Sequence, residues 1–451
     1  MPTVYKTPGV YKEEFFLQPQ AILPTGIPAF IGFADAIAAL KNLPQGVQLP
    51  ESLSSSLKGS INYDHDKKLL VFQGVMSTAA REELLALSSD KAFKQAIILL
   101  FQNAQNTVVT LHRKQEFTNH FQSRLQSYLT EAITGFFENG GTHCYVVRAA
   151  ANQNPEVALK NALKAIELLN DSDLVAIPDA MTLTEQDAII RVQQEVLKHC
   201  AKLGDRIAIL DAWPSKIGDI KIQRERLAAN QQESVNGVFY YPWIKNTENY
   251  PQPDNPNRIE KGRFVPPCGH IAGVISRSDR TRGVFKAPAN EEIFDALDLE
   301  VAIDNSTQGE LNPLGINCLR AFPGRGIRIW GARTLSSDEN WRYINVRRIF
   351  LTLARWIDRN MFWVTFEPNT EQLWVRIERE LSSYLEQLWR AGALLGQTRK
   401  QAFYVKCDAE TNSPESREKG EVLTEIGLAP SSPAEFIIVR IIQRSGIVES
   451  G

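Results

Sequence analysis

Apolar and polar positions divide the chain into two strand-like ends and an alternating interior. The segment SPAEFIIVRIIQ at 432–443 is a run of β-branched and aromatic residues that follows Pro430 and Pro433, which predicts a strand. The first fourteen residues carry shorter strand-like pieces within TPGVYKEE. Apolar edge strands recruit other chains unless they are paired. These ends therefore either complete the chain's own sheet or pair with neighbouring molecules.

Strand-like and helical patterns alternate from about residue 118 to residue 211, which predicts an α/β layer. A buried strand is also expected earlier, at 27–34, in IPAFIGFA. Within the alternating region, helices are expected at 121–137, 157–170 and 186–201, and strands at 144–148, 174–177 and 207–210.

A small inserted module is expected at 58–106. A short strand at 69–72 is followed by the helical segment REELLALS. A second helix begins near Ser89 and carries Phe93, Ile97 and Leu100 on one side. The segment 41–60, rich in Pro, Ser and Gln, is expected to be a linker before this module.

Two long amphipathic helices are expected in the C-terminal third. The first is predicted to start at a capping box formed by Ser336 and Glu339. The second is predicted to start with Asn369 as its N-cap and to end at Arg390, before Gly392. Its expected apolar stripe is Leu373, Ile377, Leu381, Tyr384 and Leu388.

Length and charge set limits on the class of protein. A chain of 451 residues is long enough for two or three domains with a large core. The net charge of -2 gives no basis for nucleic-acid binding. The stretch from Arg320 to Arg359 contains nine arginines and only three acidic residues. This excess is either a patch that faces a protein or an anion, or the solvated face of a helix.

Cysteine spacing and the N-terminal sequence point to a cytoplasmic protein. The five cysteines have no CxxC spacing, so reduced thiols are expected. The start MPTVYKTPGV has no charged segment followed by an apolar core, so no secretory signal is expected. The longest apolar runs are too short to span a membrane, so we expect no membrane insertion by this chain.

Candidate chemistry is sparse. The six histidines show no metal-ligand spacing, and PGRGIRIWGAR at 323–333 lacks the spacing of a phosphate-binding loop. Four acidic residues near expected strand ends could mark an α/β active site: Asp173, Asp179, Asp211 and Asp279. Acidic residues there are also ordinary turn formers. With no base, nucleophile or cofactor cradle beside them, no catalytic, cofactor-binding or metal-binding residue is expected, and the chain is not expected to be an enzyme.

Eight motifs in order along the chain carry a family resemblance. They are TPGVYKEE at 7–14, FFENGGTHCYVVRA at 136–149, PPCGHIAGVISRSD at 266–279, RGVFKAPAN at 282–290, LNPLGINCLRAFPGRGIRIWGARTL at 311–335, FEPNTEQLW at 366–374, WRAGALLG at 389–396 and AFYVKCDAETN at 402–412. The series resembles the tail sheath protein family of contractile phage tails and phage-like contractile injection systems. The resemblance spans almost the whole chain and is weakest over 35–118.

The resemblance implies a mixed α/β, multi-domain subunit with extended β-strand arms at both ends and a small inserted outer module. Such subunits form a helical homopolymer around an inner tube protein, and contraction drives the tube through a target envelope. The implied partners are other copies of the chain, the inner tube protein, and baseplate and terminal cap proteins, with no direct contact to nucleic acid and no cofactor. Assembly in the cytoplasm is implied, in a particle that is later released or anchored at a membrane.

The resemblance also assigns segments and side chains. The expected segments are an N-terminal arm at 1–20, the start of the core and a linker at 21–57, the outer module at 58–106, an α/β sheath domain at 107–320, a C-terminal core domain facing the tube at 321–430, and a linker strand at 431–451. The inter-subunit arm residues are Val4, Tyr5, Val10, Tyr11, Phe436, Ile438, Arg440 and Ile442. The candidates for facing the tube are Glu371, Arg376, Glu378, Arg379 and Glu386, with their solvated state as the alternative.

Two other classes of protein stay open from the sequence. One is an α/β enzyme whose terminal strands complete its own sheet, and the other is a surface-binding protein built around the module at 58–106. The presence of both arms in one polypeptide differs from the two-protein sheaths of type VI secretion systems. It favours a phage tail or a phage-like injection system, and the compact chain fits the injection systems slightly better.

Overall fold

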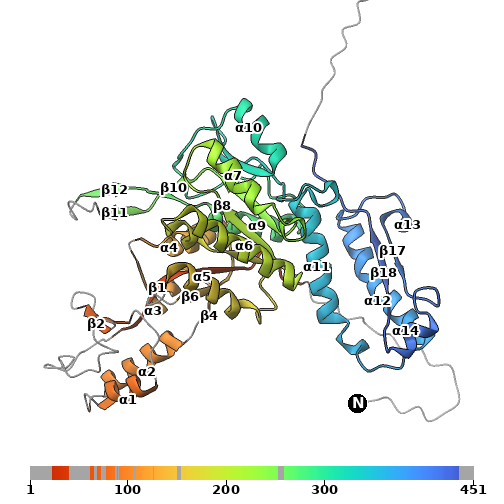
Figure 1. The fold of residues 1–451 in the computed structure, drawn as a ribbon, viewed down its shortest axis with the longest axis horizontal. Coiled ribbons are helices and arrows are strands. Elements are labelled where there is room, and N and C mark those ends of the chain that lie inside the picture. Colours follow the sequence, from red (N-terminus) through yellow and green to blue (C-terminus); the bar gives the residue numbers. More distant parts are fainter. Residues whose placement is uncertain are drawn as a thin grey trace, which may run out of the picture.

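A sheet with helices on both faces forms the centre of the molecule, and a second group of helices and strands stands beside it (Figure 1). The computed structural model describes residues 23–39, 61–64, 69–72, 78–86, 89, 91–105, 108–124, 126–149, 154–251 and 258–435. This mixed α/β architecture confirms the fold class predicted from the alternating pattern. The expected arm at 1–20 and the expected linker at 41–60 lie outside the described residues.

The middle of the large sheet is parallel. Six strands lie in the order β15-β9-β8-β7-β1-β6, and the antiparallel strands β16 and β4 flank them. Their bounds are β1 Pro28–Ala39, β4 Val108–Leu111, β6 Cys144–Ala149, β7 Leu174–Ala176, β8 Ile207–Asp211, β9 Gly237–Tyr241, β15 Ile316–Phe322 and β16 Gly326–Ile329. The near-continuous apolar sequence of the central strands follows from burial on both faces.

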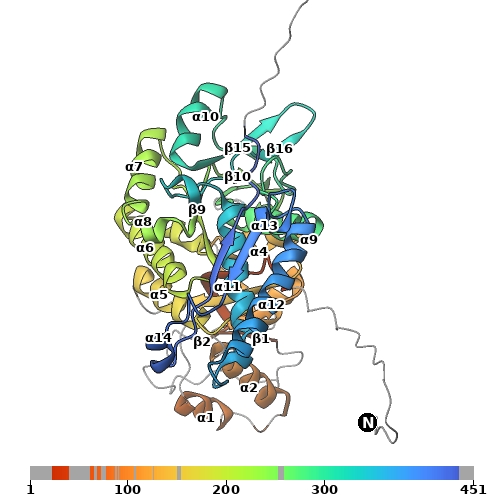
Figure 2. The ribbon, with the colours of Figure 1, turned by 90° about the vertical axis from the view of Figure 1, so that its right-hand side faces the viewer.

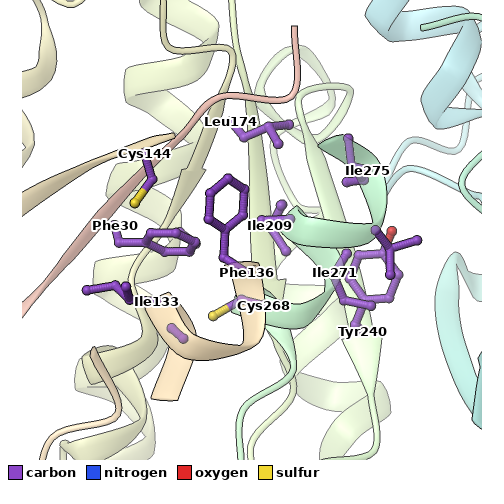
Figure 3. Close-up of a cluster of buried hydrophobic side chains, with 14 of the residues drawn as sticks. Phe30, Ile133, Phe136, Cys144, Leu174, Ile209, Tyr240, Cys268, Ile271 and Ile275 are labelled. Atoms are coloured by element: carbon purple, nitrogen blue, oxygen red, sulfur yellow. The ribbon is translucent and has the colours of Figure 1, made fainter. Parts of the chain in front are cut away.

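Successive residues of β1 feed two separate cores. Phe30 points to one face, where its ring meets that of Phe136 edge to face with centroids 5.7 Å apart (Figure 3). Ala29 and Ile31 point to the other face. Helices α4 (Leu129–Glu138) and α9 (Cys268–Arg282) cover the first face, and α5 (Pro155–Ala162), α6 (Gln186–Leu203) and α7 (Ile217–Leu227) cover the second.

Three glycines bring α4 and α9 unusually close together. A Cβ atom added to Gly269 would lie 2.2 Å from the carbonyl oxygen of Ala132. One added to Gly273 would lie 2.4 Å from the carbonyl oxygen of Phe136, and one added to Gly135 would meet the ring of His270. The motif PPCGHIAGVISRSD therefore has a packing role, since only glycine permits this backbone approach.

The inserted module is built on the far half of β1. Antiparallel β3 (Leu69–Phe72) pairs with residues 36–39, and β2 (Ile61–Asp64) and β5 (Phe121–Ser123) extend this part of the sheet. Helices α1 (Thr78–Ala86) and α2 (Lys91–Gln105) pack on it, which confirms the predicted apolar face Phe93, Ile97 and Leu100. Because Ala36 and Ala38 of β1 belong to the same core, the module shares its core with the central sheet.

Smaller elements extend the top and the edge of the central part (Figure 1). A three-stranded sheet has the order β13-β10-β14, and β11 pairs with β12 in a hairpin. The bounds are β10 Ile244–Lys245, β11 Asn249–Pro251, β12 Ile259–Lys261, β13 Phe264–Val265, β14 Asp298–Leu299, α3 Phe117–His120, α8 Gln231–Ser234 and α10 Asn305–Leu311.

Two predicted helices of the α/β layer are shorter than expected. The helix expected at 121–137 is instead the strand β5 followed by α4, because residues 121–123 pair with β1. The helix expected at 157–170 ends as α5 at Ala162 and continues as a 3-10 turn. The buried guanidinium of Arg206 donates to the carbonyl oxygens of Ile166 and Leu169 at 2.8 and 3.1 Å and so binds the turn in which this helical segment ends.

The two long C-terminal helices are present with shifted starts. The first, α11, spans Ile344–Asn360, so the expected capping box is wrong. Ser336 instead accepts a hydrogen bond from the backbone of Asp338, and Asp338 caps a short 3-10 turn.

The second helix, α12, spans Glu371–Arg390 and has Thr370 as its N-cap in place of Asn369. The Asn369 side chain is held by Trp374 and Glu421. The predicted apolar stripe of α12 is confirmed at Leu373, Ile377 and Leu381, which are buried. The expected domain boundary between residues 320 and 321 falls inside β15.

All five cysteines are buried and free. Burial raises the pKa of Cys200 and of Cys318 to about 12, and it raises the pKa of Cys144 still further. These thiols are therefore small apolar parts of the core, as the spacing of the cysteines predicts.

The close approach of α4 and α9 leads to a stability prediction. Gly269→Ala should lower the free energy of unfolding by about 1–3 kcal/mol, because the new methyl group collides with backbone that cannot move alone. Urea denaturation followed by tryptophan fluorescence measures the change. The matched control is Gly309→Ala in α10, where an added Cβ meets nothing within 4 Å and stability should stay equal or rise by up to about 1 kcal/mol. Equal effects at both positions would contradict the packing role.

Candidate assembly interface

The C-terminal part of the chain folds into a distinct unit beside the central sheet, which we call the C-terminal unit (residues 344–435). Its helices α11 and α12 pack together, with the rings of Trp356 and Tyr384 stacked 4.3 Å apart and nearly parallel. Figure 2 shows α11, α12 and α13 of this unit, and Figure 1 shows the strands β17 and β18 beside α12. The remaining bounds are α13 Arg399–Ala402, β17 Phe403–Lys406, α14 Pro414–Glu418 and β18 Glu425–Leu428.

Strands β17 and β18 form a two-stranded antiparallel sheet. In the part of the chain that the structure describes, no third strand pairs with either of its outer edges. Gly427 lies under the ring of Tyr404, where a Cβ atom would be only 2.0 Å from the ring. The sheet packs on α12 through Phe403, Val405 and Ile426, and its outer edges can accept further strands, since unpaired edges recruit other chains.

The chain enters the described part at residues 23–27, which we call the N-terminal root. The backbone N–H groups of Gly26 and Ile27 donate to the carboxylate of Asp173 at 3.0 and 2.7 Å. Leu23 is buried in the core of the C-terminal unit with Trp356 of α11 and Leu373 of α12. The N-terminal root therefore touches both the central sheet and the C-terminal unit.

A buried ion cluster lies directly behind this root. Arg348 of α11 donates to Asp173 at 2.8 Å and to both oxygens of Asp279 at 2.7 and 2.5 Å. All three side chains are buried. Burial alone would lower the pKa of Arg348, but the charges of Asp279 and Asp173 hold it above its ordinary value. The cluster joins β7, α9 and α11 through charge-assisted hydrogen bonds.

A second arginine of α11 binds the root itself. Arg355 donates to the carbonyl oxygen of Pro24 at 2.9 Å and to that of Asp171 at 3.0 Å. Its guanidinium also lies 3.8 Å from Asp173. Arg359, one turn further along α11, forms an ion pair with Asp171. Of these two arginines, Arg355 binds the N-terminal root directly, and Arg359 binds the neighbouring Asp171.

The chain leaves the described part at residues 431–435, which we call the C-terminal root. The Ser431 N–H donates to the carbonyl oxygen of Ala393 at 3.0 Å, and Asn345 of α11 donates to the Ser431 carbonyl oxygen at 2.9 Å. Arg333 forms a two-pronged ion pair with Glu435. The hydrogen bond that Arg333 donates to Glu435 raises the pKa of Arg333 above its ordinary value.

The predicted arm residues lie beyond these two roots. None of the eight is among the described residues: Val4, Tyr5, Val10, Tyr11, Phe436, Ile438, Arg440 and Ile442. Their pairing with a neighbour stays a prediction.

The residues predicted to face the tube lie on α12. Glu371, Arg376, Glu378 and Arg379 are exposed, and Glu386 is partly buried and paired with Arg390 at 2.5 Å. Arg376 pairs with Glu380 at 3.3 Å and covers the ring of Trp363 at 3.6 Å. The helix therefore presents a mixed-charge face to its surroundings, and contact with a tube stays a prediction.

Apolar groups that the sequence reading missed lie near this face. Val375 is 66% exposed between the charged positions of α12, and Phe362 is 78% exposed just before that helix. Phe366 is fully exposed and has a positive φ of 71°. No sequence signal marks Phe366, since a positive φ at a bulky residue is uncommon.

The arginines at 320–359 are divided between two places. Arg347, Arg348, Arg355 and Arg359 lie on α11, and each binds a residue outside that helix; Arg347 binds the side-chain oxygen of Asn236 at 3.0 and 2.8 Å and lies over Trp341. Arg320, Arg325 and Arg328 lie in the hairpin of β15 and β16, and Arg342 forms an exposed ion pair with Glu339 at 2.6 Å. The four arginines of α11 therefore tie that helix to its surroundings.

The acidic residues considered as catalytic have structural partners. Asp173 directly precedes β7 and so lies at a strand end as expected, whereas Asp279 lies within α9 and not at a strand end. Asp179 follows β7 and accepts from Phe33 N, Tyr128 N and the Ser127 hydroxyl, and burial raises its pKa to about 6. Asp211 ends β8 and accepts from Cys268 N at 2.9 Å, and burial raises its pKa to about 7.

A groove of about 950 Å³ opens near the carboxyl ends of β1 and β7, where α/β enzymes often bind ligands. Four of the charged side chains that line this groove form ion pairs with one another: Arg124 pairs with Asp35 at 2.6 Å, and Arg191 pairs with Glu156 at 2.7 Å. Among the described residues, no group of three His, Cys, Asp or Glu side chains could hold a metal ion. No helix of the described segments combines the length and the apolarity that crossing a membrane requires.

Family comparisons bear on this architecture. The family model described as the phage tail sheath protein central domain matches residues 156–335. The model described as the phage tail sheath C-terminal domain matches residues 336–444. The two adjacent matches cover more than half of the chain and meet between β16 and α11, where the C-terminal unit begins.

Curated relatives and solved structures agree with these matches. The tail sheath protein of Vibrio phage KVP40 is 24% identical over 353 residues, covering 72% of this chain and 50% of that protein. That of Enterobacteria phage T4 is 22% identical over 343 residues, covering 69% and 50%. The chain thus spans about half the length of these curated relatives.

Among solved structures, the PVC sheath complex of an extracellular contractile injection system in the contracted state is 25% identical. It covers 98% of this chain and 99% of that chain, with a TM-score of 0.60. The helical sheath of the anti-feeding prophage in the contracted state has a TM-score of 0.65 at 24% identity, with 98% and 100% covered.

The raised pKa of Asp211 leads to a prediction about pH. Its folded-state pKa of about 7 lies above the unfolded value of about 4, so its stabilising contribution is full below about pH 4 and is lost as the pH rises through about 7. Asp211→Asn keeps the acceptor for Cys268 N and cannot ionise. Relative to the unaltered chain, the variant should gain on the order of 3 kcal/mol between about pH 4 and pH 8.

Urea denaturation at a series of pH values measures this gain. Asp187→Asn is the control, since Asp187 is exposed on α6 and pairs with Arg226 at the surface. Stability curves of the Asp211 variant and the unaltered chain that run parallel across this pH range would show that Asp211 carries its charge at no cost.

Proposed function

The chain belongs to the phage tail sheath protein family, and from this membership we propose that it is a structural subunit of a contractile sheath. In this proposal it polymerises helically around an inner tube and contracts to drive that tube through a target envelope. The observation that carries the proposal is the C-terminal unit, where a two-stranded sheet that pairs with no third described strand lies beside the anchored roots of the two ends for which the sequence predicts strands. A polymer needs both a donor of strands and an acceptor of strands.

We propose that β17–β18 is the acceptor sheet. The terminal segments 1–20 and 431–451 of neighbouring subunits would add to its edges, with main-chain hydrogen bonds supplying affinity and alternate side chains supplying register. The donor side chains would be Val4, Tyr5, Val10 and Tyr11 from one arm, and Phe436, Ile438, Arg440 and Ile442 from the other. Each subunit gives and receives strands through different surfaces, which generates an open helical lattice.

Contraction in this proposal is a rigid-body rearrangement of subunits that stay linked by their arms. Packed interfaces are bistable, so a lattice assembled in one arrangement can release free energy on switching to another. The central sheet, with both faces buried, supplies a body stiff enough to rotate as a unit. Nucleotide chemistry is not required for this step, since the free energy is stored when the lattice forms.

The proposed partners are further copies of this chain, an inner tube protein, and baseplate and terminal cap proteins. The anti-feeding prophage baseplate structure, 25% identical and with a TM-score of 0.62, supports the association with a baseplate. Assembly in the cytoplasm and later release or membrane anchoring of the particle remain part of the proposal. Membership of a family of structural proteins also argues against the alternative that this chain is an α/β enzyme.

We also propose that the exposed face of α12 meets the inner tube. Its side chains carry both signs of charge, with Glu371, Glu378 and Arg379 free of the ion pairs that hold Arg376 and Glu386. Contacts between exposed charges are individually weak, typically below about 1 kcal/mol. Repetition along a polymer makes many such contacts effective together, yet each remains easy to break when the sheath leaves the tube.

Assembly can be tested with the isolated chain. Expressed alone, it should form hollow tubes of uniform width that negative-stain electron microscopy detects. Deleting residues 436–451 should abolish tubes and leave a folded subunit, because the cut lies beyond the Arg333–Glu435 ion pair that closes the described fold. Circular dichroism and a sharp thermal transition establish that the truncated chain is folded.

The matched control retains all sixteen C-terminal residues and replaces Ile438 and Ile442 with Lys, which keeps length and backbone but removes the apolar side of the strand. It should also fail to form tubes. Tubes formed by the truncated chain would refute strand donation by this arm, and an unfolded truncated chain would assign the strand to the subunit's own core.

The α12 face can be tested by charge reversal. The double variant Glu371→Lys, Glu378→Lys should still form sheath tubes alone but should enclose fewer inner tubes when both proteins are produced together. The control is Glu225→Lys, an exposed glutamate of α7, which changes charge without touching α12. Counting filled and empty sheaths by electron microscopy decides between them. Equal filling in all three proteins would make the face of α12 merely solvated.

A further inference from the structure

Both ends of the described chain are fastened to the same helix. The N-terminal root is bound by Arg355 of α11, and the ion cluster of Arg348 lies behind it. The C-terminal root is bound by Asn345 of the same helix. These three residues, with Thr352, form one buried polar stripe, since spacings of three, four and seven return to the same helix face.

The N-terminal root is clamped before the chain enters the sheet. Pro24 is held by Arg355, and Gly26 and Ile27 are held by Asp173, so a pull from the N-terminal side meets these bonds before it reaches β1. Asp173 in turn is neutralised by Arg348. The first side chains to bear this force therefore either belong to α11 or are bound by a side chain of α11.

The C-terminal root is clamped at the opposite end of the helix. Asn345 lies in the first turn of α11 and bridges the carbonyl oxygens of Ser431 and Phe285, each at 2.9 Å. Arg333, which holds Glu435, forms a β-bridge with Tyr343 directly before α11. Asn345 and Arg355 lie ten residues apart, so the two clamps are separated by about 15 Å of helix.

We propose that α11 is a tension member that joins the two terminal arms within one subunit. A pull on one arm would cross the subunit through α11 and its polar stripe, and the large sheet would not carry it. The role of this path in a contracting lattice rests on the proposed function. The path itself is a property of one chain, because every contact in it lies within the described residues.

This assignment explains why α11 carries two of the four arginines that are buried among the described residues. An apolar helix face would pack as well, but apolar contacts are non-directional and slide under a sideways pull. Charge-assisted hydrogen bonds to a carboxylate are short and directional, so they resist displacement of one partner past the other. Removing one partner of such a buried contact leaves the other partner buried as an uncompensated polar group. The contacts between these segments are therefore expected to form together and to break together.

Single-molecule force spectroscopy tests the proposal on the full chain. Handles at the two termini pull through both roots, and handles at Leu168→Cys and Ile222→Cys, both exposed, pull within the central part. Native cysteines do not compete for labelling, since all five are buried. Arg355→Gln and Arg333→Gln should each lower the first rupture force by roughly a third in the terminal geometry and leave it unchanged in the internal geometry.

Two controls separate tension from general stability. Arg342→Gln removes an exposed ion pair of the same region that touches neither root, and it should change neither geometry. The double variant Arg333→Glu, Glu435→Arg forms the same ion pair with the charges exchanged. Its first rupture force in the terminal geometry should therefore equal that of the unaltered chain. A variant that weakens both geometries equally, or neither, would overturn the tension path.

The outcome is independent of tube formation. A chain that shows the geometry-dependent loss but forms no tubes would keep the tension path and remove the sheath function. A chain that forms tubes but shows no geometry-dependent loss would keep the sheath function and remove the tension path.

Discussion

The structure depends on one neutralised charge, the guanidinium of Arg348. It is buried between Asp173 and Asp279, which come from positions 175 and 69 residues away in the chain. An unpaired charge at that depth is very costly, so the three segments form their joint together or not at all. Since Asp173 also binds the backbone of the N-terminal root, the same joint sets where the first terminal segment departs.

Stiffness and adhesion are assigned to different parts of the chain. The central sheet is buried on both faces and its helices approach through glycines, so it suits a body that turns without deforming. The C-terminal unit has a two-stranded sheet, exposed aromatic groups and the C-terminal root, and it binds the N-terminal root. A subunit divided in this way can change its neighbours' arrangement while its own fold stays constant, which suits a family whose members are known as sheath proteins.

The spacing of apolar residues correctly predicted those features of the fold that depend only on the local sequence. The stripe Leu373, Ile377 and Leu381 is buried as expected, because an amphipathic helix needs only a surface to pack on. The early end of α5 was not predictable from periodicity, since the turn that follows it is bound by Arg206, which lies some forty residues further along the chain. The burial of Arg348 was hidden for the same reason: arginine is usually exposed, and its partners are distant in sequence.

The candidate interface was predictable in outline, because strand-like ends and an amphipathic helix are local signals. Its joints at Asn345, Arg333 and Arg355 were not, since each is a side chain that binds a distant main-chain or acidic group.

The burial of the five cysteines has a consequence for their reactivity. Oxidation and disulfide exchange start from a thiolate that a reagent can reach, and the buried thiols with a pKa of about 12 offer neither charge nor access. A change from reducing to oxidising surroundings should therefore leave these thiols unchanged for as long as the subunit stays folded.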